Sequence, residues 1–435
     1  MEDGLTLAQS ESSDSSHARA WMRAVQLGFH EPDLDEEVIR RLETFLDMPG
    51  FVATTVFRKS AAKFSGAMDV SVGTFARFLA PVNLGAAEVT AGLPTEVDVL
   101  PTHKRRGLLW TMMALDVEQL VDEGCPLLLL MASDAQIYER FGFERVVGTF
   151  LVSFDPRGLQ MRESVKQSLQ GYNIGWVDRE SVVDVTTEIY ARVHAMTRGS
   201  IARWDSYLPH HYFPGSLEGV DRKQRCFICS DPSGTPTGFV FYEVKSESDR
   251  FVLSILDMAY TDGSTELALW QHLLSIEMID EVTYSQFTAS GPGGGSPLFR
   301  AVTDSRAIKV LGRTDFLWAK VLDPIACLEA RSYSTSASAA WMSAQFRVED
   351  PDGYASGFYR LELGEGRARV QRLDDREDYL GVTVTANALA ALVFASASVT
   401  ELAEVGLIQG LPRSEWETWD ALFTPVGPAR TSTQF

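Results

Sequence analysis

The most informative stretch of this sequence is Val97-Asp98-Val99-Leu100-Pro101-Thr102-His103-Lys104-Arg105-Arg106-Gly107-Leu108-Leu109. Its first four residues have the composition of a β-strand, which Pro101 ends because proline cannot donate a backbone hydrogen bond. Three basic residues then come directly before Gly107, and a helical pattern begins at Leu108. The stretch therefore predicts a strand, a basic loop and a helix, which is a unit typical of an α/β fold.

The residues that follow continue this unit. The predicted helix has apolar residues at helical spacing, namely Leu109, Met112, Met113, Val117, Leu120 and Val121. Gly124 is a suitable C-cap, and the apolar run 127–130 after it predicts a short buried strand. Ser133 or Asp134 can then cap a short helix that ends at Gly142.

The middle of the chain repeats this order of elements. We expect strands over residues 225–230, 238–244 and 251–260, followed by a helix capped by Ser264. The loop that matches the basic loop of the first unit is Tyr260-Thr261-Asp262-Gly263-Ser264. Because this loop is acidic, it would repel a phosphate, and we expect no second phosphate site there.

The last part of the chain, from about residue 322, has a different pattern. We expect a hairpin over residues 358–373, a strand over 379–384, and helices over 386–396 and 399–405, which is an α+β arrangement. The length of 435 residues corresponds to about three domains at roughly 150 residues each. The predicted domains are 1–165, 166–320 and 321–435.

Composition and charge narrow the classes of function. The chain has 59 Asp and Glu residues against 39 Lys and Arg residues, a net charge of −20. Such an acidic surface argues against binding to nucleic acid, which needs a basic footprint, and against docking on anionic lipid. It suits a cationic substrate, although it can also serve solubility alone.

The sequence has no feature typical of a secreted or membrane protein. The longest apolar run, residues 127–132, is too short to cross a bilayer. Residues 1–16 are polar and acidic and lack the regions of a signal peptide. Four cysteines in a chain of this length are not a disulfide framework. We therefore expect a cytoplasmic protein that does not bind membranes.

Cys226 and Cys229 form a C-x-x-C pair that does not predict a metal site. A zinc site of this kind needs four ligands, and no second pair is present in the sequence. The pair lies in a predicted strand rather than at a helix start, which argues against redox chemistry. We interpret both cysteines as structural residues and expect no metal.

The basic loop before Leu108 has the composition of an anion site. The first N–H groups of a helix have no partner within the helix, and the helix dipole is positive at that end. Gly107 allows the backbone to approach a diphosphate closely, and Arg105 and Arg106 add permanent positive charge. The alternative interpretation is a solvated basic loop without a ligand.

Three passages resemble the enhanced intracellular survival (Eis) family of actinobacterial acetyltransferases, within the GNAT superfamily of N-acetyltransferases. They are residues 99–109, which are similar to the GNAT pyrophosphate loop, Ala132-Ser133-Asp134-Ala135-Gln136-Ile137-Tyr138-Glu139-Arg140-Phe141-Gly142-Phe143, and the terminal Phe435. The resemblance covers the whole chain. It implies an acetyltransferase domain, a second, degenerate acetyltransferase-like domain and a C-terminal sterol-carrier-like domain.

The resemblance also implies the chemistry and the assembly. The donor would be acetyl-CoA, and the acceptors would be amines, often several amines of one aminoglycoside, or lysine side chains. The family forms a large homo-oligomer, which for this chain implies a homohexamer.

The same resemblance implies roles for individual residues. The acyl-CoA site would comprise a strand, a diphosphate loop and the start of a short helix, namely Val97, Asp98, Val99, Arg105, Arg106, Gly107, Leu108, Leu109, Trp110, Ser133 and Asp134. Tyr138 would be the general acid, and the C-terminal carboxylate of Phe435 would be the general base. A tyrosine keeps its proton at neutral pH and can donate it to a departing thiolate. Apart from the resemblance, Tyr138 would be a core residue and Phe435 a frayed chain end.

Acidic residues after the first predicted helix are candidates for binding ammonium groups. Glu31 is the residue we select, together with its neighbours Asp33 and Asp35. The alternative interpretation is a solvated acidic turn. The penultimate residue of the chain is Gln434, whereas an acidic residue there would have added to a cationic pocket.

These observations predict an acetyl-CoA-dependent N-acetyltransferase that acts on cationic, aminoglycoside-like amines. We expect direct transfer in a ternary complex, because no Cys or Ser nucleophile is marked in the sequence. One alternative is a protein or peptide lysine acetyltransferase with the same site. Another is a lipid or sterol carrier, in which residues 322–435 bind an apolar ligand. The basic loop and Tyr138 favour the enzyme.

Overall fold

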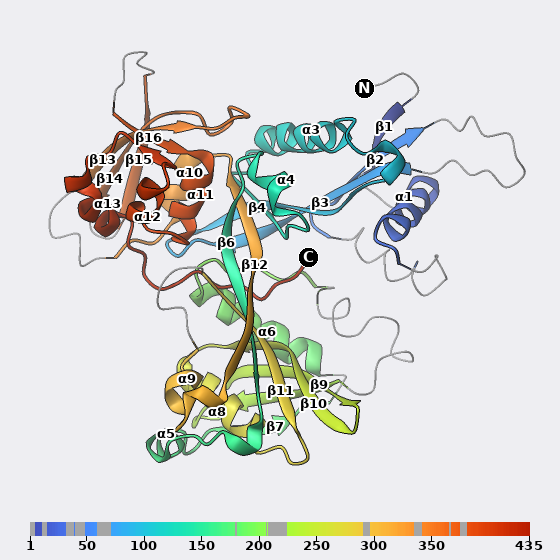
Figure 1. Cartoon of the computed structure of the whole chain (residues 1–435), viewed down its shortest axis with the longest axis vertical. Helices are drawn as coiled ribbons and strands as arrows, with labels where there is room; N and C mark the ends of the chain where they lie inside the picture. The colour runs from blue at the N-terminus through green and yellow to red at the C-terminus, as the bar shows by residue number, and fades with distance from the viewer. Residues whose placement is uncertain are drawn as a thin grey trace, which may run out of the picture.

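In the part of the chain that the structure describes, a twelve-stranded sheet runs through two domains and a five-stranded sheet lies in a third (Figure 1). This computed structural model describes residues 5–10, 15–31, 39, 48–58, 71–178, 181–205, 207, 224–289, 296–334, 342–364, 367–374 and 381–435. Asp33 and Asp35 lie outside the described residues.

The first domain contains the predicted strand, loop and helix. Its elements are β1 (Leu5–Ser10), α1 (Ser15–Gly28), β2 (Val52–Arg58), β3 (Ser71–Asn83), β4 (Glu88–Val99), η1 (Pro101–His103), α3 (Leu108–Asp122), β5 (Leu127–Leu130), α4 (Ala135–Glu139) and β6 (Glu144–Phe154). The predicted strand at 97–100 is the end of the longer strand β4, and α3 begins at Leu108 as predicted. Asp134 caps α4 because its carboxylate accepts the Gln136 N–H over 3.1 Å.

The second domain repeats these elements in the same order. They are η2 (Pro156–Gly158), α5 (Glu163–Ser168), β7 (Asn173–Trp176), α6 (Val182–Met196), β8 (Arg225–Ser230), β9 (Pro236–Glu247), β10 (Arg250–Tyr260), α8 (Gly263–Leu273), β11 (Glu281–Ala289), α9 (Leu298–Ala301), η3 (Ser305–Ala307) and β12 (Lys309–Val321). The prediction that Ser264 caps the helix is wrong. Asp262 is the cap, because its carboxylate accepts the N–H groups of Ser264 and Thr265, each over 2.9 Å.

The third domain has the predicted α+β pattern. Its elements are α10 (Pro324–Ala330), β13 (Met342–Glu349), β14 (Gly357–Gly364), β15 (Arg367–Leu373), β16 (Val382–Thr385), α11 (Ala386–Phe394), α12 (Val399–Glu404), β17 (Ile408–Gln409), η5 (Arg413–Glu415) and α13 (Trp416–Leu422). The strands form a sheet in the order β15-β14-β13-β16-β17. Helix α11 is buried along nearly its whole length, as its almost uniformly apolar sequence requires.

The first two domains share the centre of the large sheet. The strand order is β1-β2-β3-β4-β5-β12-β6-β11-β10-β9-β8-β7. Strand β12 is the last strand of the second domain, yet it pairs antiparallel with both β5 and β6 of the first domain, while β6 also pairs with β11 (Figure 1). Each domain is therefore completed by a strand that comes from the other part of the chain.

Within each half of the sheet, one pair of parallel strands diverges. Strands β4 and β5 pair only at Ala91 with Leu127 and at Gly92 with Leu128, although β4 continues for seven more residues to Val99. Strand β4 is irregular over this extension, and Glu96 has a positive φ of 51°. Strands β10 and β11 pair over residues 252–255, and β10 then continues beyond an irregularity to residue 260. Each half of the sheet thus has one opening.

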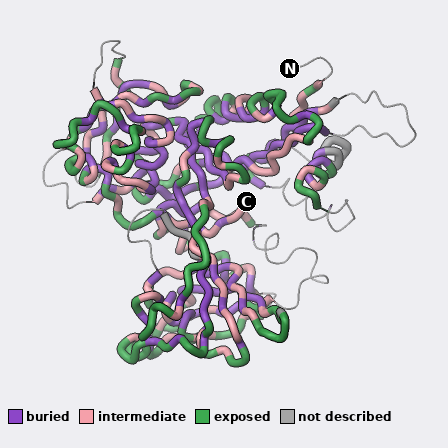
Figure 2. Tube along the Cα trace, in the orientation of Figure 1, coloured by how far each residue is buried: buried purple, intermediate pink, exposed green. Residues whose placement is uncertain are grey.

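Buried residues follow the central strands of the large sheet (Figure 2), and their side chains form separate cores. In the first domain, Trp21 and Phe78 belong to a core under α1 that continues into the third domain. Met112 and Leu128 belong to a separate core under α3. The sheet therefore separates an α1 side from an α3 side, and the opening between β4 and β5 joins them.

Candidate active site

The start of α3 is shaped to receive an anion. Gly107 is the N-cap residue, with φ of 76° and no side chain to occupy the helix end. The first bond within the helix is donated by Thr111 to the Gly107 carbonyl oxygen over 3.0 Å, so the preceding N–H groups point out of the helix end. A Cβ atom on Gly107 would contact nothing within 4 Å, so this end is open.

Positive charge surrounds this helix end. Lys104, Arg105 and Arg106 are all exposed. Arg105 has a positive φ of 64°, which turns the chain sharply before Gly107, and Arg106 Nη2 donates to the Thr102 carbonyl oxygen over 3.3 Å. Helix dipole and guanidinium groups thus attract the same ligand, a phosphate or diphosphate.

The residues after Gly107 connect the loop to α4. Leu108 is buried and Leu109 is half-buried, which fixes the first turn of α3 against the core. Trp110 is half-exposed, and its ring stacks on Phe141 with centroids 4.8 Å apart. The diphosphate loop and the segment that follows Tyr138 are therefore in direct contact.

The end of strand β4 presents alternating side chains. Val97 and Val99 pack against the core on the α3 side. The Asp98 carboxylate lies on the α1 side, where a Cβ atom built on Gly28 would come within 2.4 Å of it. Because pairing with β5 ends at Gly92, the backbone of residues 97–99 borders the opening in the sheet.

Tyr138 is held in α4 directly after the buried strand β5. Its side chain is buried on the α3 side and packs edge-on against Phe143, with ring centroids 6.0 Å apart. Burial, with a smaller effect of the Asp134 carboxylate, raises the pKa of Tyr138 to about 12. The phenol therefore stays protonated at neutral pH. Ser133 and Asp134 are exposed at the start of this helix.

Phe435 returns from the third domain to the first. Its ring packs edge-on against Phe78 of β3, with centroids 5.8 Å apart, and Phe78 also contacts Trp204 over 4.8 Å. Figure 1 shows the C-terminus beside the sheet of the first domain, between the upper and lower parts of the molecule. Phe435 lies on the α1 side and Tyr138 on the α3 side, so the sheet separates them and the opening between β4 and β5 joins the two sides.

Glu31 is exposed and follows α1 directly. Its N–H donates to the Gln26 carbonyl oxygen over 2.9 Å, and this bond closes the end of the helix after His30, which has a positive φ of 60°. Gly28, three residues earlier, touches Asp98. The end of α1 thus places acidic groups on the side of the sheet that also carries Phe435.

Three buried ion pairs were not predicted from the sequence. They are the Arg77–Asp116 ion pair between β3 and α3, Lys320 with Asp350, and Arg203 with Asp257. Lys320 could have been found as a single lysine in an apolar strand, but its partners are remote in sequence. The pairings of Arg77 and Arg203 follow no local pattern.

The helix of the second domain that corresponds to α3 has a closed start. Asp262 occupies the start of α8 with its own carboxylate, which accepts the first N–H groups of the helix. Cys226 and Cys229 are both free and buried in β8, and burial raises the pKa of the Cys229 thiol to about 12. The start of α8 is therefore closed to an anion, and the two cysteines of β8 are thiols rather than reactive thiolates.

The described residues contain no group of three or more His, Cys, Asp or Glu side chains arranged to hold a metal ion. No helix in the described part of the chain is long and apolar enough to cross a membrane.

Family models match all three domains. Models described as an acetyltransferase (GNAT) domain match residues 12–146 and 199–313, and a sterol carrier protein domain model matches residues 325–430. The predicted fold, two tandem acetyltransferase-like domains and a sterol-carrier-like domain, is confirmed.

Related sequences and structures agree with these models. An uncharacterized N-acetyltransferase of Streptomyces griseus is 30% identical over 431 residues, covering 97% of this chain and 96% of the relative. N-acetyltransferase Eis of Mycobacterium tuberculosis is 26% identical over 354 residues, covering 80% of this chain and 81% of the relative. The crystal structure of Eis1 from Mycobacterium abscessus has a TM-score of 0.76 at 22% identity and covers 99% of this chain and 100% of that one. This chain is an N-acetyltransferase that belongs to the Eis family of the GNAT superfamily.

Proposed function

We propose that this enzyme transfers the acetyl group of acetyl-CoA to amines of cationic acceptors by direct transfer in a ternary complex. The observation that carries the proposal is the contrast between two helix starts. The start of α3 has no side-chain cap and three basic neighbours, whereas Asp262 closes the corresponding start of α8. Of these two helix starts, only that of α3 has the positive charge and the free space that a diphosphate needs.

The opening in the sheet suits the remainder of the donor. Residues 97–99 border it with backbone groups, and Ser133 and Asp134 lie at the opposite edge, at the end of β5. Bound acetyl-CoA supplies a thioester whose carbonyl carbon is attacked by the amine nitrogen as the C–S bond breaks. We assign the residues of the loop and of these two edges to acyl-CoA binding.

The two catalytic assignments follow from where the protons move. Tyr138 donates its phenolic proton to the sulfur that leaves, and its raised pKa keeps that proton available at neutral pH. The Phe435 carboxylate accepts, directly or through water, the proton that the attacking nitrogen loses. An α-carboxylate has a pKa of about 3.5, so it acts on a nitrogen that has already become cationic.

The class of acceptor is proposed from the negative charge of the protein. The chain carries a net charge of −20, and Glu31, Asp98 and the terminal carboxylate lie on the α1 side of the sheet. Such a surface raises the local concentration of molecules that bear several ammonium groups. Aminoglycoside-like polyamines fit this description, and one such molecule offers several amines for acetylation.

Two other functions remain distinct alternatives. A lysine side chain in a protein or peptide could use the same site, because it also presents a cationic amine. A lipid carrier would instead use the third domain, where the described helix α11 is packed into the core rather than lining an empty chamber. The open, basic helix start favours the enzyme over the carrier.

The remaining proposals concern assembly and location. We propose a homohexamer in the cytoplasm, with domain boundaries near residues 165 and 320. Gel filtration with light scattering would report the number of chains.

The function is tested by measuring thiol release from acetyl-CoA with a panel of acceptors. The panel contains aminoglycosides, linear polyamines, lysine peptides and a neutral alcohol of similar size. We expect release with the polycationic amines, and about 10²–10⁴-fold less turnover for Tyr138→Phe, which removes only the hydroxyl group. Release that is equal with the alcohol, or absent with every amine, would contradict the proposal.

A further inference from the structure

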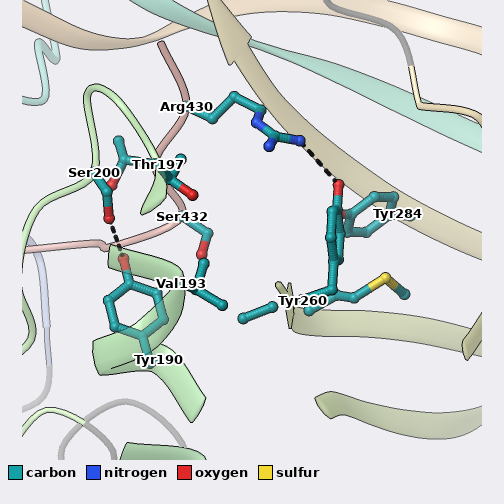
Figure 3. A pocket seen from close by; sticks show the side chains of 11 residues that line it. Tyr190, Val193, Thr197, Ser200, Tyr260, Tyr284, Arg430 and Ser432 are labelled. Atoms are coloured by element: carbon teal, nitrogen blue, oxygen red, sulfur yellow. Dashed lines mark hydrogen bonds between the residues drawn. The ribbon is translucent and has the colours of Figure 1, made fainter. Parts of the chain in front are cut away.

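The C-terminal tail lies beside the opening in the second half of the sheet. Strand β10 pairs with β11 only as far as Ile255 and Tyr284, and beyond this point the segment 430–432 lies between β10 and α6 (Figure 3). A cavity of about 60 Å³ remains, lined by α6, by the ends of the two strands and by the tail. In the first domain, the corresponding opening is the proposed acyl-CoA site.

One buried ion pair binds the C-terminal tail. Arg203 Nη1 lies 2.8 Å from Asp257 Oδ2, and the two side chains are 5% and 1% exposed. The guanidinium also stacks on Tyr190 at 3.7 Å and on Tyr207 at 4.4 Å. Ser432 Oγ accepts from Arg203 Nη2 and donates to Asp257 Oδ1, each over 3.1 Å.

The next tail residues are held by tyrosine hydroxyl groups. The Tyr207 hydroxyl donates to the Ser432 carbonyl oxygen over 3.4 Å and accepts the Gln434 N–H over 3.1 Å. The Tyr190 hydroxyl lies 2.7 Å from Thr433 Oγ1. These bonds fix the backbone immediately before Phe435.

A second set of contacts holds the start of the tail. The Arg430 N–H donates to the Arg198 carbonyl oxygen over 2.8 Å, and Arg430 Nη1 donates to the Tyr260 hydroxyl over 3.3 Å (Figure 3). Arg198 Nε donates to the Gly427 carbonyl oxygen over 3.2 Å. The tail is therefore bonded to the second domain along its whole length rather than at one point.

We propose that the second domain, which has lost its own phosphate site, serves as the anchor that positions the catalytic carboxylate of Phe435. The positioning residues in this account are Arg203, Asp257 and Tyr207. The tail residue to which they bond is Ser432. The proposal rests on the proposed role of Phe435 as the general base. A terminal residue is ordinarily mobile, and a base that must find its position on each cycle loses the advantage of preorganisation.

The burial of the Arg203–Asp257 pair strengthens its hydrogen bonds to Ser432. Hydrogen bonds to charged groups are stronger than those between neutral groups, and few water molecules can compete where both charges are buried. Ser432 bonds to both charges at once. Removing the Ser432 hydroxyl group would leave the ion pair intact, so the second domain should still fold.

The experiment uses Ser432→Ala in the full chain, with Ser432→Thr as the conservative variant. Thr424→Val is the control, because it lies outside the contacts that hold the tail. Thr424 Oγ1 donates a hydrogen bond to the Asp420 carbonyl oxygen. It forms none of the hydrogen bonds described above between the second domain and the tail. Two readouts are taken: turnover at saturating acetyl-CoA and amine, and the rate at which carboxypeptidase A releases Phe435. Melting temperature and the KM for acetyl-CoA are measured alongside.

We expect Ser432→Ala to lower turnover about tenfold and to speed release of Phe435 by a similar factor, because it removes two charge-assisted hydrogen bonds. The melting temperature and the KM for acetyl-CoA should not change. Ser432→Thr should recover most of both losses. Tyr207→Phe, a second route to the same result, should act in the same direction.

Three outcomes would overturn the proposal. An unchanged rate of Phe435 release in Ser432→Ala would show that these contacts do not anchor the tail. Lower turnover that Ser432→Thr does not restore would assign the effect to general damage. Faster release with unchanged turnover would show that an anchored terminus is not needed, and would trace the failure to the proposed role of Phe435, which its deletion tests separately.

Discussion

At the scale of single residues, the difference between the two halves of the sheet lies in one position at a helix start. Gly107 caps α3 without a side chain and leaves its first N–H groups facing an open, basic loop. Asp262 caps α8 and satisfies the equivalent groups with its own carboxylate. Because the same backbone groups cannot serve both a carboxylate and a phosphate, only the first domain can bind the donor there.

We therefore expect calorimetry to show one acetyl-CoA bound per chain. Arg106→Glu should weaken this binding by about 100-fold or more, because a charge-assisted contact is replaced by repulsion at the helix end. Arg306→Glu, which makes the same change of charge at an exposed residue of the second domain, is the matched control. Unchanged affinity in Arg106→Glu, or two molecules bound per chain, would refute the loop assignment.

The sequence was sufficient to place these residues but not the buried ion pairs. Gly107, the basic run and Asp134 lie in local patterns of strand, loop and helix start, and local patterns are readable from one sequence. Arg203 and Asp257 are 54 positions apart, and each alone is an ordinary charged residue. Their pairing depends on the packing of the tail, which no local pattern records.

At the scale of elements, strand β12 joins all three domains. Lys320 in this strand is 1% exposed, and its ammonium donates to the Phe141 carbonyl oxygen over 2.6 Å and to Asp350 and Asp352 over 3.3 and 2.5 Å. The bond to Phe141 lies just beyond α4, the helix that carries Tyr138. The two aspartates belong to the third domain, so one buried cation links that domain to the segment behind the proposed acid.

Lys320→Met should destabilise the protein by about 3–5 kcal/mol, because it leaves buried carboxylates without a cation. At roughly 2–4 °C per kcal/mol for a cooperative unit of about 150–250 residues, the melting temperature of the unit that contains Lys320 should fall by about 10 °C. Lys166→Met is the control, since Lys166 forms an exposed ion pair with Glu163 and such pairs contribute little. Adding Asp350→Asn to Lys320→Met should recover part of the loss. A melting temperature equal to that of the wild type would show that the cluster is not a structural link.

The fold at this scale was predicted in its elements but not in its strand order. Strands at β4, β5 and β8–β10 and the helices α3, α4 and α8 lie where the patterns indicated. The insertion of β12 between β5 and β6 was not predicted. Apolar and polar alternation shows that a segment is a strand, but the partner is chosen by contacts that are distant in sequence.

At the scale of the whole molecule, the proposed site is assembled from both ends of the described chain. The donor loop and Tyr138 come from the first domain, the anchor comes from the second, and the terminal residue reaches back from the third (Figure 1). In the proposed account, the second domain holds the segment that carries Phe435 through these hydrogen bonds.

The most direct test of this account is turnover after deletion of Phe435, measured at saturating acetyl-CoA and amine. The new carboxylate on Gln434 would lie about 3.3–3.6 Å short of the old one along an extended chain, too far for proton transfer between atoms that must approach to about 2.6–3.2 Å. We predict that turnover falls about 10²–10⁴-fold while calorimetric affinity for acetyl-CoA is unchanged. Turnover close to that of the wild type would contradict the account and would place the general base among the acidic residues of the first domain or in a water molecule.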